Sequence, residues 1–203
     1  GSDGPLAVSL DGFARYQSEE AWTWEHMALT RARPVYGSPK ARAATQAIID
    51  DVLRRPRDTA RLIADAAKMR ADMATHKPPK GPLDVKLASG GLVDLEFLTH
   101  VTQLRTGAGL TPILAEAISD LAAKGFVSSD MPAAHALLTR MLVAVRLMAP
   151  SLAEPPLTTR PVIARACGLA DWDSLLAELA RTRQSVAREW GRISTTGDEY
   201  HAE

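Results

Sequence analysis

Residues 86–97 read Lys-Leu-Ala-Ser-Gly-Gly-Leu-Val-Asp-Leu-Glu-Phe, and this stretch decides which kind of fold the chain can adopt. Just before the glycines, apolar and polar side chains alternate, which predicts a minor strand-like segment near residues 83–87. After the glycines, apolar residues recur at helical spacing as far as about Arg105. The sequence therefore predicts a turn at Gly90 and Gly91 that leads into a long helix.

The glycine pair is a candidate anion site. Glycines before a helix expose backbone N–H groups, and these groups together with the helix dipole attract negative charge. Lys86 would add a cation, so we predict that Lys86, Gly90 and Gly91 bind phosphate. The alternative is an ordinary turn that uses glycine for its backbone freedom. Spacing alone favours the ordinary turn, because short glycine motifs often match by chance.

Asp94 and Glu96 are two residues apart, a spacing that allows two carboxylates to bind a metal pair on a strand. On a helix the same two residues point roughly 200° apart. Because the stretch after Gly91 has helical spacing, we expect neither residue to bind a metal. Asp94 lies in the first helical turn, where a negative charge favours the helix dipole. We predict no catalytic and no metal-binding residue in this chain.

The composition limits the classes of protein to consider. The chain has 203 residues, of which 46% are apolar, with 24 basic and 24 acidic side chains. This balance argues against a nucleic-acid-binding protein. Cys167 is the only cysteine; we expect it to be buried, and the lack of disulfides fits a cytoplasmic location. No apolar run approaches the length of a transmembrane helix, so we expect no membrane partner.

Caps and helix breakers divide the rest of the chain. Ser9, Ser38 and Asp58 are candidate N-caps, and prolines and glycines mark most helix ends. The pattern predicts an all-α fold, a helical bundle of about seven helices with short connections. The predicted helical segments are a short one after Ser9, then 20–33, 39–55, 59–75, 92–105, 112–124, 132–148, 161–167 and 174–193.

Residues 20–33, the signature segment, read Glu-Ala-Trp-Thr-Trp-Glu-His-Met-Ala-Leu-Thr-Arg-Ala-Arg. This segment closely resembles a signature of the bifunctional glutamine-synthetase adenylyltransferase/adenylyl-removing enzymes. Residues 4–16 resemble the end of that family's nucleotidyltransferase domain, and residues 86–97 resemble its Lys-x-x-x-Gly-Gly-x-x-Asp-x-Glu-Phe stretch. The resemblance extends from residue 4 to about residue 104 and continues more loosely after it.

The resemblance implies a division into domains. Residues 1–37 would be the end of the nucleotidyltransferase domain and a connecting helix, and residues 38–193 would be a helical bundle domain. The polar residues 194–203 are predicted to form a flexible tail. The opening Gly1-Ser2 resembles an expression remnant, and we expect the chain to be part of a longer protein.

The resemblance also implies an activity. The family's enzyme transfers AMP from ATP to a tyrosine of glutamine synthetase, uses Mg²⁺, and responds to the PII signalling protein and to glutamine. The family's Asp-x-Asp pair, which binds magnesium, is missing here. We therefore expect the chain alone to be inactive and to bind no cofactor tightly.

Two alternatives remain open. The chain could be a regulatory module that binds PII, glutamine or glutamine synthetase, because a helical domain beside a catalytic one is well placed for this role. It could also be part of the related PII uridylyltransferase, which shares the Gly-Gly-x-x-Asp-x-Glu-Phe type of stretch. The Trp-Thr-Trp-Glu-His run in the signature segment favours the adenylyltransferase.

Arg31 and Arg33 end the signature segment, and they are the other candidate phosphate-binding residues. Either could contact phosphate or a partner protein. The alternative for each is a salt bridge across the junction between domains, a role that Glu25 could share because it lies on the same helical face as Arg33.

Four further residues have expected roles. His26 is expected to be packed or hydrogen-bonded rather than catalytic. Trp22 and Trp24 are expected to anchor packing, since aromatic side chains bury large apolar areas. Glu96 is expected to support Lys86 or a backbone amide rather than to take part in chemistry.

Overall fold

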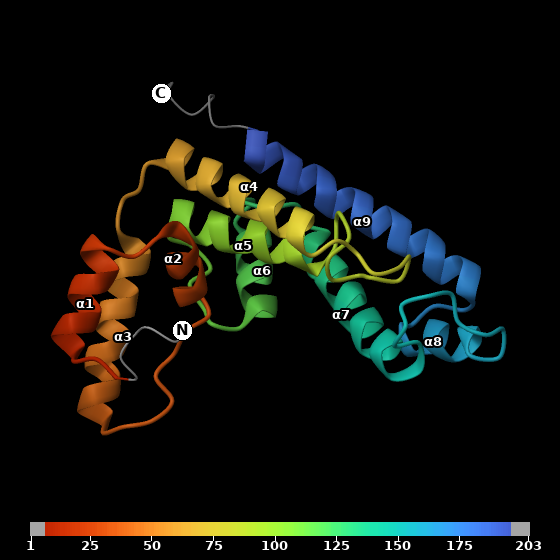
Figure 1. Cartoon of the computed structure of the whole chain (residues 1–203), viewed down its shortest axis with the longest axis horizontal. Coiled ribbons are helices and arrows are strands. Elements are labelled where there is room, and N and C mark those ends of the chain that lie inside the picture. Colours follow the sequence, from red (N-terminus) through yellow and green to blue (C-terminus); the bar gives the residue numbers. More distant parts are fainter. Residues whose placement is uncertain (1–6, 196–203) are drawn as a thin grey trace.

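The computed structural model describes residues 7–195, and this part of the chain contains helices and turns but no strand (Figure 1). The predicted all-α class is confirmed. The described range holds nine helices, one for each predicted segment and more than the predicted total of about seven, and two of them, α2 and α8, are only seven residues long. The helices are α1 (Leu10–Glu19), α2 (Thr23–Leu29), α3 (Pro39–Arg54), α4 (Thr59–His76), α5 (Leu92–Thr106), α6 (Leu114–Ala123), α7 (Met131–Met148), α8 (Arg160–Ala166) and α9 (Trp172–Thr195).

Three helices begin where the sequence predicts, because short polar side chains cap them. The side chain of Ser9 accepts a hydrogen bond from the third residue of α1, at 3.0 Å. Ser38 caps α3 in the same way, with proline as the first helical residue, and Asp58 caps α4 at 3.0 Å. These bonds satisfy backbone N–H groups that have no partner inside the helix.

Helix α5 is the centre of the core. Twelve of its fifteen residues are buried, which is the pattern of a helix enclosed on all sides. It contacts α4, α6, α7 and α9 as well as α2 and α3. Figure 1 shows α4 and α9 side by side above α5, with α1–α3 at one end of the molecule and α8 at the other. The start of α5 is therefore held from several directions.

The strand-like segment predicted near residues 83–87 is wrong: these residues form consecutive turns. Asp84 explains the difference, because its carboxylate accepts hydrogen bonds from the backbone N–H groups of Lys86 (3.2 Å) and Leu87 (3.0 Å). Such bonds give the backbone a local alternative to a sheet. The apolar alternation has another cause, since Leu83 and Val85 are buried in the core.

The signature segment is less helical than predicted. Helix α2 covers Thr23–Leu29 rather than 20–33. It begins late because the backbone N–H of Trp22 donates to the side chain of Glu25 at 2.9 Å, which closes a capping arrangement at its first turn. At the other end, the hydroxyl of Thr30 donates to the carbonyl oxygen of Met27 at 2.7 Å, where the helix stops.

The boundary predicted at residue 37 stays a prediction. Of the segment 1–37, the described part packs on the rest through α1, which contacts α3, and through α2, which contacts α3, α4 and α5. The predicted tail 194–203 begins too early by two residues, because Ser194 and Thr195 still belong to α9. The remainder of that tail lies outside the described residues.

Helix α7 is long and apolar enough to cross a membrane by length and composition, and it is the one such helix in the described range. The sequence analysis expects no run of this kind. Helix α7 also contacts α5, α6, α8 and α9 and buries seven residues against them. A core helix passes the same test of hydropathy, and this packing fits a core helix.

Candidate functional site

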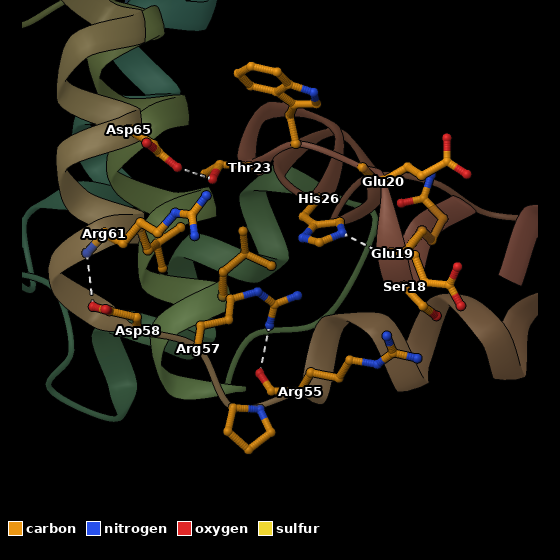
Figure 2. A pocket seen from close by; sticks show the side chains of 16 residues that line it. Ser18, Glu19, Glu20, Thr23, His26, Arg55, Arg57, Asp58, Arg61 and Asp65 are labelled. Carbon is orange, nitrogen blue, oxygen red and sulfur yellow. Dashed lines mark hydrogen bonds between the residues drawn. The ribbon is translucent and has the colours of Figure 1, made fainter. Parts of the chain in front are cut away.

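A cleft of about 460 Å³ lies between the α1–α2 connection and the α3–α4 connection (Figure 2). Each wall combines a connection between two helices with the adjacent helix ends, and connections are where functional residues concentrate in rigid scaffolds. The floor is reached by Leu104, near the end of the central helix α5. The walls are formed by residues 17–23, His26, residues 55–58, Arg61, Leu62 and Asp65.

Arg57 shapes one wall of the cleft. Its guanidinium group donates to the carbonyl oxygens of Leu53 (3.1 Å) and Arg55 (2.8 Å), and also to that of Val52. These carbonyls have no partner at the end of α3, so Arg57 caps that helix. Burial lowers the pKa of Arg57, and the charge of Arg55 lowers it further.

His26 forms part of the opposite wall, and Figure 2 shows it and Arg57 facing the same space. Its Nε2 lies 3.0 Å from the carbonyl oxygen of Gln17, so Nε2 carries the proton and donates. Burial lowers the pKa of His26, which favours the neutral ring. The expectation that His26 is packed and hydrogen-bonded is confirmed. Its Nδ1 is then the ring nitrogen that can accept a proton.

Gln17 adds a buried polar group to the cleft. Its side chain is only 7% exposed, and its Oε1 atom has no hydrogen-bond partner within residues 7–195. A buried acceptor without a donor is unfavourable. The cleft therefore offers an acceptor at Gln17 to a ligand that carries a donor.

The charges around the cleft are mixed. Asp58 is used as the cap of α4, and Asp65 accepts a hydrogen bond from the hydroxyl of Thr23. Arg55 pairs with Asp51 at 2.6 Å. Both signs of charge are therefore present, and several of these groups already have partners inside the fold. The charged lining residues are Glu19, Glu20, Arg55, Arg57, Asp58, Arg61 and Asp65.

The structure places the predicted phosphate-binding residues Lys86, Gly90 and Gly91 at the other end of α5. The helix runs from Leu92, beside the glycines, to the cleft at Leu104, which is roughly 18 Å at 1.5 Å per residue. The glycine turn and the cleft are therefore separate places. Lys86 is exposed.

The backbone N–H groups of both glycines are already used inside the fold. Gly90 donates to the carboxylate of Asp94, and Gly91 donates to the carbonyl oxygen of Ala88 at 2.8 Å. Packing requires both glycines. Gly90 has φ +71°, and a Cβ there would lie 1.9 Å from the carbonyl oxygen of Arg183 in α9. At Gly91 it would lie 2.6 Å from that of Val85. Phosphate binding by this turn stays a prediction.

Asp94 and Glu96 point to different elements, as their helical spacing predicts. Asp94 is buried and pairs with Arg70 of α4. Glu96 lies 3.8 Å from Arg31, so the expectation that it supports Lys86 or a backbone amide is wrong. Helix packing brings Glu96 to the end of the signature segment instead. Among residues 7–195, no three His, Cys, Asp or Glu side chains group to hold a metal.

The two tryptophans of the signature segment are not packing anchors. Trp22 is 72% exposed and Trp24 is 53% exposed. The buried anchors of α2 are Met27 and Leu29 instead. Trp22 and Trp24 lie at the exposed start of α2, whereas the buried Met27 and Leu29 lie nearer its end.

Within residues 7–195, Glu25 forms no salt bridge with a cation. Glu25 accepts a hydrogen bond from the hydroxyl of Tyr16 at 2.7 Å and another from the backbone of Trp22. Arg33 is exposed beyond the end of α2. The proposed roles of Arg31 and Arg33 in phosphate or partner binding stay predictions.

The sequence analysis missed the arginines of the cleft. Residues 54–58 read Arg-Arg-Pro-Arg-Asp, a local density of positive charge next to a helix break. That pattern is the signal that could have identified Arg57 and Arg61 as neighbours of a polar cleft. Gln17 carried no comparable signal, because its environment depends on distant segments.

Two family models match the chain. Residues 1–48 match the model described as Glutamate-ammonia ligase adenylyltransferase, and residues 59–193 match the model described as GlnD PII-uridylyltransferase. The cleft lies where these two matches meet, since its walls come from residues 17–26 and 55–65.

Several curated proteins are similar to the chain, and those described here share one name: bifunctional glutamine synthetase adenylyltransferase/adenylyl-removing enzyme. The protein from Brucella suis biovar 1 is 36% identical over 203 residues, which cover 95% of this chain and 20% of the relative. The protein from Rhodopseudomonas palustris strain HaA2 is 38% identical, with 95% and 20% covered. The protein from Mesorhizobium japonicum is 36% identical, with 97% and 21% covered. The chain spans about one fifth of the length of these relatives.

Proposed function

The chain belongs to the family of glutamine synthetase adenylyltransferases, with residues 59–193 matched by the PII-uridylyltransferase model, and from this premise we propose that it is the helical segment of an enzyme that transfers AMP from ATP to glutamine synthetase. The observation that carries the proposal is the 36% identity over 95% of the chain to a relative of that name. The match of residues 1–48 favours the adenylyltransferase over the uridylyltransferase. A cytoplasmic location belongs to the same proposal.

The proposal assigns the metal-dependent chemistry to another part of the full-length protein. Such a transfer uses ATP and Mg²⁺, and no group of three metal-binding side chains occurs among the described residues. We therefore expect the 203-residue chain to transfer no AMP by itself. Its contribution would be to support the end of the signature segment and to form a polar cleft.

The signature segment is well fixed for such a supporting role. Thr23 donates a hydrogen bond to Asp65 of α4, and Thr30 contacts His100 of α5 at 2.7 Å. The exposed Arg31 and Arg33 follow directly after α2. Because α2 is held on both sides, the backbone that carries these arginines is held in place. Their side chains can then extend from a fixed position toward phosphate or a protein partner.

A segment exchange tests the proposal. In the Brucella suis relative, the matched one fifth is replaced by this chain, and transfer of AMP to glutamine synthetase is measured. We expect transfer to continue, while the same relative without the segment transfers none. A chimera that has the helical content of the parent but transfers no AMP would contradict the proposal.

A regulatory or interaction role for the same segment is the second candidate. Large apolar side chains are exposed on the N-terminal third, including Trp22, Trp24 and Tyr36. Exposed aromatic residues of this kind are typical of protein-binding surfaces. The partner would be glutamine synthetase or the PII signalling protein, with glutamine as a small effector.

Lys86→Ala in the full-length enzyme distinguishes the two candidates. If Lys86 contacts phosphate, the variant slows AMP transfer even at saturating effector concentrations. If only the response to PII or glutamine changes and the basal rate is kept, the regulatory role is favoured for this residue. Lys80→Ala is the matched control, because Lys80 is an exposed lysine six residues earlier.

A further inference from the structure

A second, smaller pocket lies between the end of α2, the middle of α5 and the start of α6. Its volume is about 60 Å³, and it shares no lining residue with the cleft. We call it the His100 pocket. It is lined by Arg31, His100, Gln103, Thr111, Pro112, Leu114 and Ala117.

Hydrogen bonds determine which ring nitrogen of His100 carries the proton. Its Nδ1 lies 2.7 Å from the hydroxyl oxygen of Thr30 and 3.0 Å from Oε1 of Gln103. The Thr30 hydroxyl already donates its hydrogen to Met27, and the Gln103 amide nitrogen already donates to the carbonyl oxygen of Gly109. Both oxygens near Nδ1 are therefore acceptors, and Nδ1 must carry the proton.

The other ring nitrogen of His100 is then an unused acceptor. The side chain is only 7% exposed, and Nε2 has no hydrogen-bond partner in the described range. Burial lowers the pKa of His100, which favours the neutral ring with a bare lone pair on Nε2. A buried acceptor of this kind is unfavourable unless a donor reaches it.

The same pocket also presents donors. Helix α6 begins at its edge with Leu114, and the residue before it, Ile113, provides no side-chain cap. The first backbone N–H groups of α6 have no partner inside the helix, and the helix dipole makes them attractive to an anion. Arg31 adds a guanidinium group, whose contact with Glu96 is long, at 3.8 Å.

The neighbouring carboxylates narrow the choice of anion. Glu116, in the first turn of α6, accepts a hydrogen bond from Thr111 at 2.9 Å, and Glu96 faces Arg31. An anion that only accepts hydrogen bonds would face the lone pair of His100 Nε2 and these two negative charges. An anion that carries its own O–H group would instead donate to one of these acceptors.

We propose that the His100 pocket binds one hydrogen phosphate group, whose O–H donates to Nε2 of His100 while its other oxygens accept from Arg31 and from the N–H groups that begin α6. The volume supports a single group, because about 60 Å³ has room for only a few water-sized groups. A nucleotide is too large for it. The group can belong to inorganic phosphate or to a small phosphomonoester. This inference goes beyond the proposed function and does not depend on it.

The experiment titrates the 203-residue chain with inorganic phosphate near neutral pH and follows the ¹⁵N signals of the histidine side chains. We expect saturable binding, with a change in the Nε2 signal of His100 as it accepts a hydrogen bond. Sulfate at equal ionic strength, which carries no O–H group at this pH, should leave that signal unchanged. Glycerol phosphate identifies the source: a response like that of phosphate assigns the site to phosphomonoesters as well, and a weaker response assigns it to the free ion.

A pair of arginine variants supplies the matched control. Arg31→Gln should weaken phosphate binding about tenfold or more, because it removes a charged donor. Arg165→Gln makes the same change in net charge in α8, outside the pocket lining, and should leave the affinity unchanged. Both side chains are exposed, so both variants should fold.

Three results would overturn the proposal. The first is an Nε2 signal of His100 that does not respond to phosphate. The second is equal binding of sulfate and phosphate, which would mean unselective attraction by positive charge. The third is equal weakening by Arg31→Gln and Arg165→Gln, which would place the anion elsewhere on the surface.

Discussion

Asp94 connects three segments of the chain: helix α4, the glycine turn and the first turn of α5. Its carboxylate pairs with Arg70 of α4 and accepts the backbone N–H of Gly90, while its own backbone lies in the first turn of α5. Both Arg70 and Asp94 are buried. The one carboxylate therefore neutralises a buried cation and holds the glycine turn.

Asp94→Ala should lower the free energy of unfolding by about 3–5 kcal/mol, because it leaves the Arg70 charge buried without a partner. Urea unfolding followed by circular dichroism measures this change. Asp72→Ala is the control, since it breaks the exposed Lys68–Asp72 pair of α4 and should have almost no effect. Equal losses of the free energy of unfolding would mean that the buried Arg70–Asp94 pair contributes no more to stability than the exposed Lys68–Asp72 pair.

Cys167 shows how burial controls the reactivity of a single side chain. The sequence analysis predicts that it is buried, and the structure confirms this. Burial raises the pKa of its thiol, so the reactive thiolate is scarcer than in an exposed cysteine. We expect alkylation by iodoacetamide to be very slow in the folded protein and fast in denaturant. Rapid labelling of the folded protein at one site would contradict the buried position.

The turn that precedes α5 is fixed by its contact with α9. Arg183 of α9 donates from Nε to the carbonyl oxygen of Ser89 at 3.0 Å, and the backbone of the same residue lies against Gly90. The two elements approach closely because Gly90 has no side chain. The sequence predicts the turn, whereas the contact with α9, more than ninety residues later, explains why Gly90 is needed.

Gly90→Ala should lower the free energy of unfolding by about 2 kcal/mol or more, because it combines a positive φ with overlap against the α9 backbone. Gly191→Ala is the matched control in α9, where a Cβ would meet no atom within 4 Å. It should raise that free energy by up to about 1 kcal/mol through helix propensity. Thermal and urea unfolding measure both. A Gly90→Ala variant with an unchanged free energy of unfolding would show that the turn can move away from α9.

The whole molecule is organised around α5, and its stability should follow this arrangement. Helix α5 is enclosed on all sides, whereas α1 has its main contact with α3 alone and exposes Leu10 and Tyr16. Regions with few buried contacts open at a lower free energy than the core. The end of the molecule that carries the signature segment is therefore expected to be less stable than its centre.

Amide hydrogen exchange followed by mass spectrometry tests this order of stability. We expect α5 to exchange most slowly and α1 to exchange much faster, with α2 between them because it contacts α3, α4 and α5. Equal protection of α1 and α5 would mean that the described part of the chain opens as one unit.

The sequence by itself determined the features that depend on neighbouring residues. Helix starts at Ser9, Ser38 and Asp58 follow from caps within three residues, and the helix after Gly91 follows from a period of apolar residues. The all-α class follows from the same local signals. These interactions reach only a turn or so along the chain, so a local pattern contains the information needed to predict them.

Only the tertiary structure decided which distant groups meet. Asp94 pairs with a residue 24 positions earlier, and Thr30 reaches His100 across 70 positions. Such partners depend on how helices pack, and helix packing depends on the sum of many burial contacts rather than on one motif. For this reason the glycine turn, predicted as a phosphate site, lies against α9. The same packing brings His26 and Arg57 together at one cleft and leaves His100 with an unused acceptor at another pocket.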